Sequence, residues 1–205
     1  MKLKDSYFFT LREDARDEDS KSGNLLVKAG YIKKTSAGIY MMLPLGLRVQ
    51  DKVEKIIRKH MNKAGSQEVK MPALIASEYY ENSGRLQGFG PSIFKLKDRT
   101  GKDMVLGPTH EELFAFASKS MIRSYKDMPF NLYQIQTKFR DEPRARFGLI
   151  RVKEFVMKDA YSFDRDEQGL DVAYKKMFDD YKAIFDEIGL NYRIVKADTG
   201  IMGGL

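Results

Sequence analysis

Two extended segments joined by a short loop place the strongest constraint on the fold of this chain. Residues 131–142 alternate apolar side chains, such as Leu132 and more weakly Ile135, with polar ones, and residues 149–163 resume an extended pattern. The residues between them, 143–148 (PRARFG), begin with Pro and end with Gly, which favour a loop. The two segments therefore predict a long antiparallel hairpin.

The predicted hairpin brings charged and aromatic side chains onto one surface. Side chains of a strand alternate between its faces, so Arg140 and Glu142 share a face, and Arg151, Phe155 and Asp159 share one on the returning strand. If these faces coincide, the surface suits a nucleotide, because arginine matches phosphate oxygens and a phenyl ring can stack on a base. An exposed hairpin whose charges merely pair with one another explains the same spacing.

Helices and shorter strands are predicted before and after the hairpin. Residues 49–64 have the clearest helical pattern, because apolar side chains recur from Val49 to Ala64 at helical spacing and Gly65 follows. The other predicted elements are helices over 23–29, 109–122 and 167–188, hairpins over 31–43 and 94–106, a short strand within 67–74 that runs into Pro72, and a strand over 191–198. Pro72 cannot donate a ladder hydrogen bond and should lie at a strand end or sheet edge. The last helix is expected to have one apolar face, formed by Leu170, Tyr174, Met177, Phe178, Tyr181, Ile184, Phe185 and Ile188. Together these elements indicate an α+β domain.

Composition limits the kinds of site that this domain can hold. The chain has 36 Lys and Arg against 29 Asp and Glu, a formal charge of +7, which favours anionic partners. A solvated basic surface explains this excess equally well. The absence of cysteine excludes disulfides and cysteine nucleophiles, and two histidines are too few for a His-rich metal site. Without a signal-peptide core or a run of 18 apolar residues, we expect a cytoplasmic protein with no membrane span.

Five separate blocks of sequence carry a resemblance to one family. They are GYIKKTSAGIYMMLPLGLRV at 30–49, QEVKMPAL at 67–74, LGPTHEE at 106–112, FRDEPRARFGLIRVKEFVMKDAYSF at 139–163 and ADTGIMGG at 197–204. In this order they resemble the front half of the catalytic domain of bacterial-type prolyl-tRNA synthetases, which are class II aminoacyl-tRNA synthetases. The resemblance covers essentially residues 1–205 and implies the class II antiparallel sheet flanked by helices.

The resemblance implies ATP-dependent activation of L-proline to prolyl-adenylate and transfer of the prolyl group to tRNA(Pro). In this family's pattern, Arg140 is the catalytic residue that contacts the α-phosphate of ATP and the carboxylate of proline. Glu142 helps to hold the adenine end, Arg151 contacts the γ-phosphate and Phe155 stacks on adenine. Asp159 ends the motif, and a carboxylate that orients a neighbouring arginine explains it at least as well as contact with a ligand.

Thr109 and Glu111 resemble the pair that receives the imino group of proline. This role suits their chemistry, since a cationic secondary amine has two N–H donors that a hydroxyl or carbonyl and a carboxylate can accept. The same two residues could also be a helix N-cap and an acid that compensates the helix dipole. His110, between them, could line the same pocket, but a structural histidine whose hydrogen bonds are satisfied is the favoured interpretation. His60 is interpreted as structural.

The resemblance also implies partners and missing parts. The helix 49–64 and Pro72 correspond to the motif that forms a homodimer interface in the family. The third class II motif, the editing domain and the anticodon-binding domain are not recognised in the sequence, and ligands for Mg²⁺ are expected outside it. Two alternatives stay open: a non-catalytic remnant or paralogue that dimerises or binds RNA, and a nucleotide-binding domain with another substrate.

Overall fold

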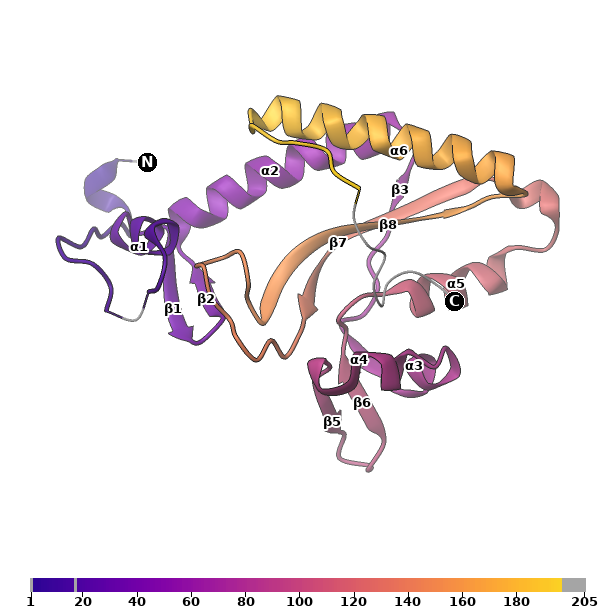
Figure 1. The fold of residues 1–205 in the computed structure, drawn as a ribbon, viewed down its shortest axis with the longest axis horizontal. Helices are drawn as coiled ribbons and strands as arrows, with labels where there is room; N and C mark the ends of the chain where they lie inside the picture. The colour runs from indigo at the N-terminus through magenta and orange to yellow at the C-terminus, as the bar shows by residue number, and fades with distance from the viewer. Residues whose placement is uncertain (1, 17, 197–205) are drawn as a thin grey trace.

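The computed structural model describes residues 2–16 and 18–196, and it has the expected α+β architecture (Figure 1). None of the helices in this part of the chain has the length and apolar content that crossing a bilayer requires. In chain order the elements are η1 (Leu3–Asp5), α1 (Lys21–Lys28), β1 (Ile32–Ser36), β2 (Ile39–Met42), α2 (Pro44–Lys63), β3 (Gln67–Glu68), β4 (Leu74–Ala76), α3 (Glu78–Asn82), α4 (Arg85–Phe89), η2 (Gly90–Ser92), β5 (Lys95–Lys97), β6 (Asp103–Leu106), α5 (Glu111–Met121), η3 (Tyr125–Asp127), β7 (Phe130–Phe139), β8 (Glu154–Phe163) and α6 (Glu167–Ile188).

The long hairpin of β7 and β8 is the centre of the fold, as the sequence predicts. The two strands pair antiparallel in continuous register from Phe130 opposite Phe163 to Phe139 opposite Glu154. β3 joins the other edge of β7 in parallel, so the sheet is not purely antiparallel. The strands are shorter than predicted, because the connection between them runs over residues 140–153 rather than 143–148.

The two longest helices, α2 and α6, lie side by side above this sheet (Figure 1). Near the C-terminal ends of the two helices, Glu187 lies 2.7 Å from the Nε2 atom of His60, which confirms a structural role for this histidine. The predicted apolar face of α6 is only partly packed, and its N-terminal half is the more exposed one. Leu170 and Tyr174 are 51% and 73% exposed, and Ile184 is the buried residue of this helix. Helical spacing predicts a face but not the element that covers it.

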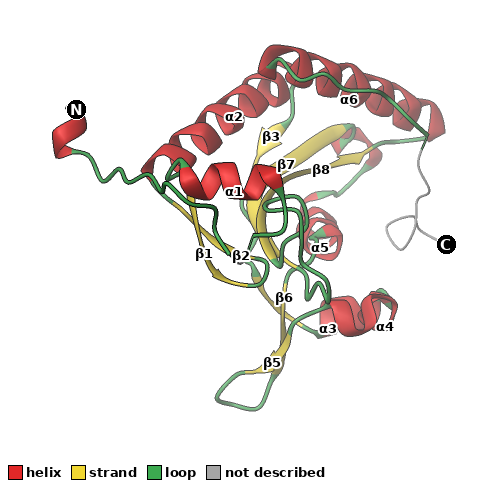
Figure 2. Ribbon diagram, turned by 60° about the vertical axis from the view of Figure 1, so that its left-hand side comes forward, coloured by secondary structure: helices red, strands yellow, loops and turns green. Residues whose placement is uncertain are grey.

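A second unit, formed by β4, β5, β6, α3 and α4, extends from the lower end of the sheet (Figures 1 and 2). Its core contains Ile75, Tyr80, Phe89, Ile93, Val105 and Leu113. The predicted hairpin over 94–106 is confirmed as β5 and β6, and β4 pairs with β6. The strand predicted to run into Pro72 is shorter than expected, because β3 ends at Glu68 and a separate strand, β4, begins at Leu74. Pro72 lies outside both strands, as expected for a residue that cannot donate a ladder hydrogen bond.

Two further predictions about local structure are wrong. Thr109 does not cap α5, because His110 occupies the cap position and the Thr109 hydroxyl donates to Glu111 instead. Residues 191–196 form no strand, and the remaining two residues of that prediction lie outside the described residues. The block ADTGIMGG lies outside them as well.

The first turn of α2 packs closely against the start of the β1–β2 hairpin. A Cβ atom added to Gly46 would lie 2.2 Å from the carbonyl oxygen of Tyr31. That oxygen also accepts a hydrogen bond from the backbone N–H of Leu43, just before the helix. Since both partners are backbone atoms, neither can move without displacing the hairpin from α2. Glycine is therefore required here by the close approach of two backbones.

We predict that Gly46→Ala lowers the free energy of unfolding by about 1–3 kcal/mol, because the added methyl group forces the hairpin away from α2. Chemical denaturation measures this change. The matched control is Gly169→Ala, at the same position in the first turn of α6, where the nearest atom to an added Cβ is a side-chain carboxylate oxygen of Asp166 at 3.3 Å. The control variant should stay within about 1 kcal/mol of the parent; equal losses in both variants would contradict the prediction.

Candidate functional site

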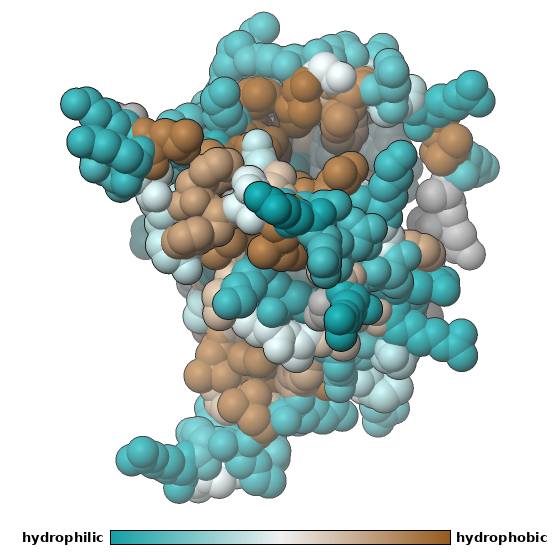
Figure 3. Space-filling model, turned by 90° about the vertical axis from the view of Figure 1, so that its left-hand side faces the viewer, coloured by the Kyte–Doolittle hydropathy of each residue, from teal (hydrophilic) through white to brown (hydrophobic). Residues whose placement is uncertain are grey.

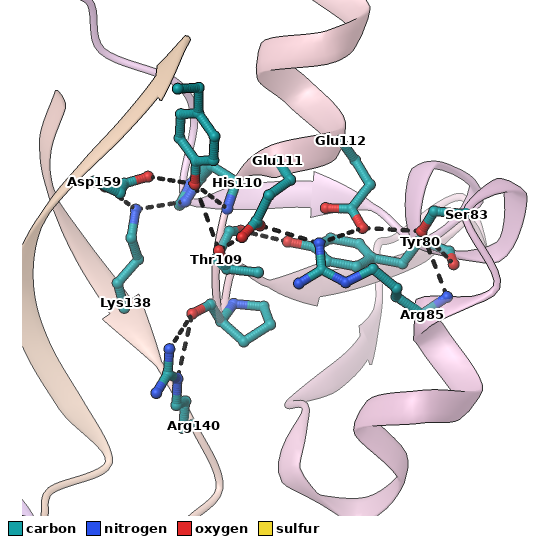
Figure 4. A network of polar contacts seen from close by, with 12 residues as sticks. Tyr80, Ser83, Arg85, Thr109, His110, Glu111, Glu112, Lys138, Arg140 and Asp159 are labelled. Carbon is teal, nitrogen blue, oxygen red and sulfur yellow. Dashed lines mark hydrogen bonds and ion pairs between the residues drawn. The ribbon is translucent and has the colours of Figure 1, made fainter. Parts of the chain in front are cut away.

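The candidate site lies where the end of β7 meets the loop before α5 (Figure 4). The backbone N–H of Phe139 donates to the carbonyl of Gly107, at 3.0 Å. One residue later, the Nε and Nη2 atoms of Arg140 lie 3.4 and 3.3 Å from the carbonyl oxygen of Pro108. The hairpin and the loop are thus joined by backbone and side-chain contacts, and Arg140 is held beside the loop that carries Thr109.

Arg140 and Phe155 share one surface, which confirms the geometry expected from strand alternation. The guanidinium carbon of Arg140 lies 5.3 Å from the centroid of the Phe155 ring. Phe155 is half-buried and also borders a hollow of about 320 Å³ that Tyr40, Thr137 and Leu149 help to line. A ring that is neither sealed in the core nor fully exposed can offer a face to a flat ligand.

Glu142 and Arg151 lie beyond the strand ends, in the connection between β7 and β8. The Nη2 atom of Arg151 is 2.8 Å from the Oε1 atom of Glu142, and this hydrogen bond lowers the pKa of the carboxyl group. The side chain of Arg151 is 47% exposed, so its guanidinium is accessible to solvent. These two residues therefore form a partly exposed ion pair. This is the arrangement expected if the charged residues of the hairpin only pair with one another and bind no ligand.

Thr109 and Glu111 lie together at the start of α5 (Figure 4). The buried Thr109 hydroxyl donates its proton to the Glu111 carboxylate, so the lone pairs of the hydroxyl oxygen can still accept. Tyr80 donates to the carbonyl of Thr109 at 2.5 Å. Arg85 lies 3.1 Å from a carboxylate oxygen of Glu111 and 3.1 Å from one of Glu112. The pair predicted to receive an amine is thus assembled, and Glu111 already faces one cation.

A buried polar cluster lies directly behind this loop. The Nζ atom of Lys138 is 2.6 Å from Nδ1 of His110 and 2.8 Å from Oδ1 of Asp159. Lys138 and His110 have no exposed surface. Burial, followed by the charge of Lys138, lowers the pKa of His110 to about 4, so the ring is neutral near pH 7. This supports the interpretation of His110 as a structural histidine whose hydrogen bonds are satisfied.

Asp159 differs from the expectation that it orients an arginine. Its partner is Lys138, and it also accepts hydrogen bonds from Gln134 and Tyr161, both at 2.9 Å. Lys138 and Arg85 were missed by sequence reasoning. Lys138 could have been noticed as a charged residue two positions before Arg140 on the same strand face. Arg85 had no such signal, because it lies in a segment without a clear pattern.

The residues present do not form a metal site. Among residues 2–16 and 18–196, no group of three or more His, Asp or Glu side chains is placed to hold a metal ion. The site is instead a set of cations, carboxylates, a hydroxyl and an aromatic ring. Such a set can bind and orient a charged ligand, and it contains no Cys or Ser–His nucleophile.

Solved structures with the same fold include two from parasitic protozoa. A prolyl-tRNA synthetase of Giardia lamblia in complex with prolyl-adenylate superposes with a TM-score of 0.74 and 20% identity, over 80% of this chain and 34% of that chain. One from Cryptosporidium parvum, complexed with L-proline and AMP, gives a TM-score of 0.70 and 16% identity, over 79% of this chain and 32% of that chain. At these identities the comparison shows the fold alone.

The sequence comparisons confirm the resemblance on which the site residues were predicted. The chain is 52% identical over 204 residues to proline--tRNA ligases of Caldicellulosiruptor saccharolyticus and of a Nocardioides species, across 100% of its own length. It spans only 36% and 35% of those relatives. The model of the "tRNA synthetase class II core domain (G, H, P, S and T)" matches residues 94–204, more than half of the chain. The chain therefore belongs to the class II tRNA synthetase core-domain family.

Proposed function

We propose that this chain contributes part of an active site in which ATP activates L-proline to prolyl-adenylate, before transfer of the prolyl group to tRNA(Pro). The observation that carries the proposal is the position of Arg140, which lies over Phe155 and is bound to the loop of Thr109 and Glu111. One cation thus lies between a ring suited to a base and a pair suited to an amine. The 52% identity to proline--tRNA ligases supports the same reaction.

In the proposed reaction the carboxylate of proline attacks the α-phosphorus of ATP, and pyrophosphate leaves. Two anionic groups must approach each other, so a cation that contacts both lowers the barrier. Arg140 suits this role because guanidinium stays ionised and offers several donors in a fixed plane. Its contact with Pro108 holds it in place before any ligand binds. Positioning and charge stabilisation supply the catalysis, and no covalent enzyme intermediate is needed.

The amine end of proline is proposed to bind Thr109 and Glu111. Glu111 is already paired with Arg85, which also contacts Glu112. A bound imino group would bring a second cation to the Glu111 carboxylate, whose two oxygens can accept from both. The hydroxyl of Thr109 would accept the second N–H of the amine. This arrangement favours a cationic amine over an uncharged group of the same size.

The triphosphate end is proposed to lie along Arg151, with adenine near Phe155 and Glu142. Arg151, which is 47% exposed, can exchange its partner Glu142 for a phosphate, since ion pairs open to solvent contribute little stability. Mg²⁺ usually binds through substrate phosphates and few protein carboxylates. The proposed Mg²⁺ would therefore arrive with ATP, in the cytoplasm, where we place the reaction.

A homodimer interface is proposed on the face that carries α1, β2 and the start of α2, together with Pro72. Brown apolar patches interrupt the charged surface on this side of the molecule (Figure 3). Leu47 and Val49 at the start of α2 are 48% and 49% exposed, and Met41 of β2 is 51% exposed. Exposed apolar side chains that gather on one face are typical of an interaction surface.

We predict that Arg140→Ala reduces proline-dependent ATP–pyrophosphate exchange by at least about two to three orders of magnitude, in the protein as encoded in its natural reading frame. The fold should persist, because Arg140 lies at the strand end and not in the core. The matched control is Arg165→Ala. Arg165 also donates to a backbone carbonyl, that of Met128, and lies over the Tyr125 ring, but at the far end of the hairpin. Near-normal exchange in Arg140→Ala would refute the role of this residue.

We predict that Glu111→Gln raises KM for L-proline by roughly tenfold or more and leaves KM for ATP unchanged, because the amine loses its counter-charge while the groups proposed for the triphosphate and adenine are untouched. Steady-state exchange kinetics at varied proline and ATP separate the two constants. Glu112→Gln is the control, since Glu112 contacts Arg85 and Ser83 but not Thr109. A rise in KM for proline of the same size in the control would assign the effect to Arg85 and not to the proposed amine contact.

We predict that Val49→Lys shifts the protein from dimer to monomer in light scattering at fixed concentration, because a buried unpaired ammonium is costly in an interface. Val172→Lys is the control. Val172 lies on α6, away from the proposed interface, and is 69% exposed. A variant of Val49 that remains dimeric would argue against α2 as part of the interface.

A further inference from the structure

Lys138 is a lysine whose side chain is completely buried next to the candidate site. It lies on β7, two residues before Arg140, and has no exposed surface. Burying an ammonium group is costly unless partners compensate it, and here burial lowers the pKa of Lys138 while the hydrogen bond and charge of Asp159 raise it. A methionine would fill similar space without this cost. The charge therefore needs an explanation beyond packing.

Two contacts of His110, one with Pro72 and one with Lys138, determine which of its ring nitrogens carries the proton. The Nε2 atom of His110 is 3.1 Å from the carbonyl oxygen of Pro72, and a carbonyl can only accept. Nε2 must therefore carry the proton, which leaves Nδ1 as an acceptor for the neutral ring. An ammonium can only donate, so Lys138 is matched to Nδ1 at 2.6 Å. The two contacts tie the loop residue His110 to β7 on one side and to the segment before β4 on the other.

His110 is part of the continuous stretch that forms the proposed proline site. Its neighbours are Thr109 and Glu111, and Pro108 supplies the carbonyl that holds Arg140. A second connection passes through Asp159, which binds Lys138 and accepts from the Tyr161 hydroxyl, and that hydroxyl lies 3.5 Å from the hydroxyl oxygen of Thr109 (Figure 4). Lys138 thus stabilises the loop through His110 and, separately, through Asp159. Its buried side chain is not placed to contact the substrate.

We propose that Lys138 is a positioning residue for the proline site: its buried ammonium, held between His110 and Asp159, keeps residues 108–111 in the arrangement that receives the amino acid. The inference rests on the proposed function and adds to it a residue that acts through others. Small displacements of groups that position a substrate are expensive, since about 1 Å can cost roughly 100-fold in rate. Loss of Lys138 should therefore impair the use of proline far more than the use of ATP.

The kinetic test compares Lys138→Met with Lys158→Met in the protein as encoded in its natural reading frame. Lys158 lies on β8 and donates to the hydroxyl of Tyr181 on α6, so its removal takes away a hairpin lysine that is not in the cluster. We expect Lys138→Met to raise KM for L-proline roughly tenfold, with KM for ATP unchanged. Lys158→Met should change neither constant. Equal rises in both Michaelis constants of Lys138→Met would overturn the inference.

A second variant separates positioning from stability. In Lys138→Met, Asp159 is left as a buried carboxylate without its cation, which destabilises the fold. Adding Asp159→Asn removes that charge and should recover most of the lost thermal stability. Because His110 still lacks its donor, KM for L-proline should stay high in the double variant. If KM for proline instead recovers together with stability, and Asp159→Asn alone leaves it unchanged, Lys138 has only a structural role.

The protonation state of His110 provides a readout that does not depend on activity. The charged groups that face this ring are Lys138 from β7, Asp159 from β8 and Glu111 from α5. ¹⁵N spectra of the parent protein should show a protonated Nε2 and an unprotonated Nδ1. Because the charge of Lys138 lowers the pKa of His110, Lys138→Met should raise that pKa above about 4.

The outcomes distinguish the inference from the proposed function. If the parent protein shows no proline-dependent exchange, the proposed function fails, whatever the spectra show. If exchange occurs and Lys138→Met keeps the parent KM for L-proline, only the inference fails. A parent His110 that is protonated at Nδ1 near pH 7 would overturn it independently, because the contact with Lys138 would then not exist as described.

Discussion

The continuous pairing of β7 with β8 is the constraint on which the rest of the structure depends. Their register places Lys138 opposite Phe155 and Gln134 opposite Asp159, so one sheet face carries the groups of the candidate site. A shift of one residue would move every one of these side chains to the other face. The loop before α5 can contact Arg140 only because the end of β7 is fixed by this pairing and by the hydrogen bond from the backbone N–H of Phe139 to the carbonyl of Gly107.

Charge balance is the second organising feature. The site contains both cations and carboxylates, and each buried charge in it has a partner of opposite charge within hydrogen-bond distance. Buried pairs of this kind contribute little net stability but penalise any rearrangement that would separate them. They therefore favour one geometry of the loop at residues 108–111. The proposed reaction would benefit from such rigidity, because catalysis by positioning requires groups that are in place before the ligand arrives.

Much of the fold could be predicted because its signals are local. The apolar spacing from Val49 to Ala64 predicted α2, and the turn residues 36–38 predicted the hairpin of β1 and β2. Strand alternation also predicted that Arg140 and Phe155 share a surface. The strand that runs into Pro72 is shorter than predicted, because β3 pairs with β7 only over Gln67–Glu68 and the chain then continues to β4, which pairs with β6. The prediction that Thr109 caps α5 was wrong, because its hydroxyl donates to a nearby carboxylate, that of Glu111.

The sequence by itself determined where most helices and strands form, which family the chain resembles and that Arg140 and Phe155 share a surface. Periodicity, turn residues and short motifs are properties of neighbouring residues, so they can be recognised without knowledge of the packing. Only the tertiary structure decided that Lys138 is buried against His110 and Asp159, that Arg85 faces Glu111, and that the N-terminal part of the apolar face of α6 stays exposed. These features depend on contacts between residues far apart in the chain, which no local pattern specifies.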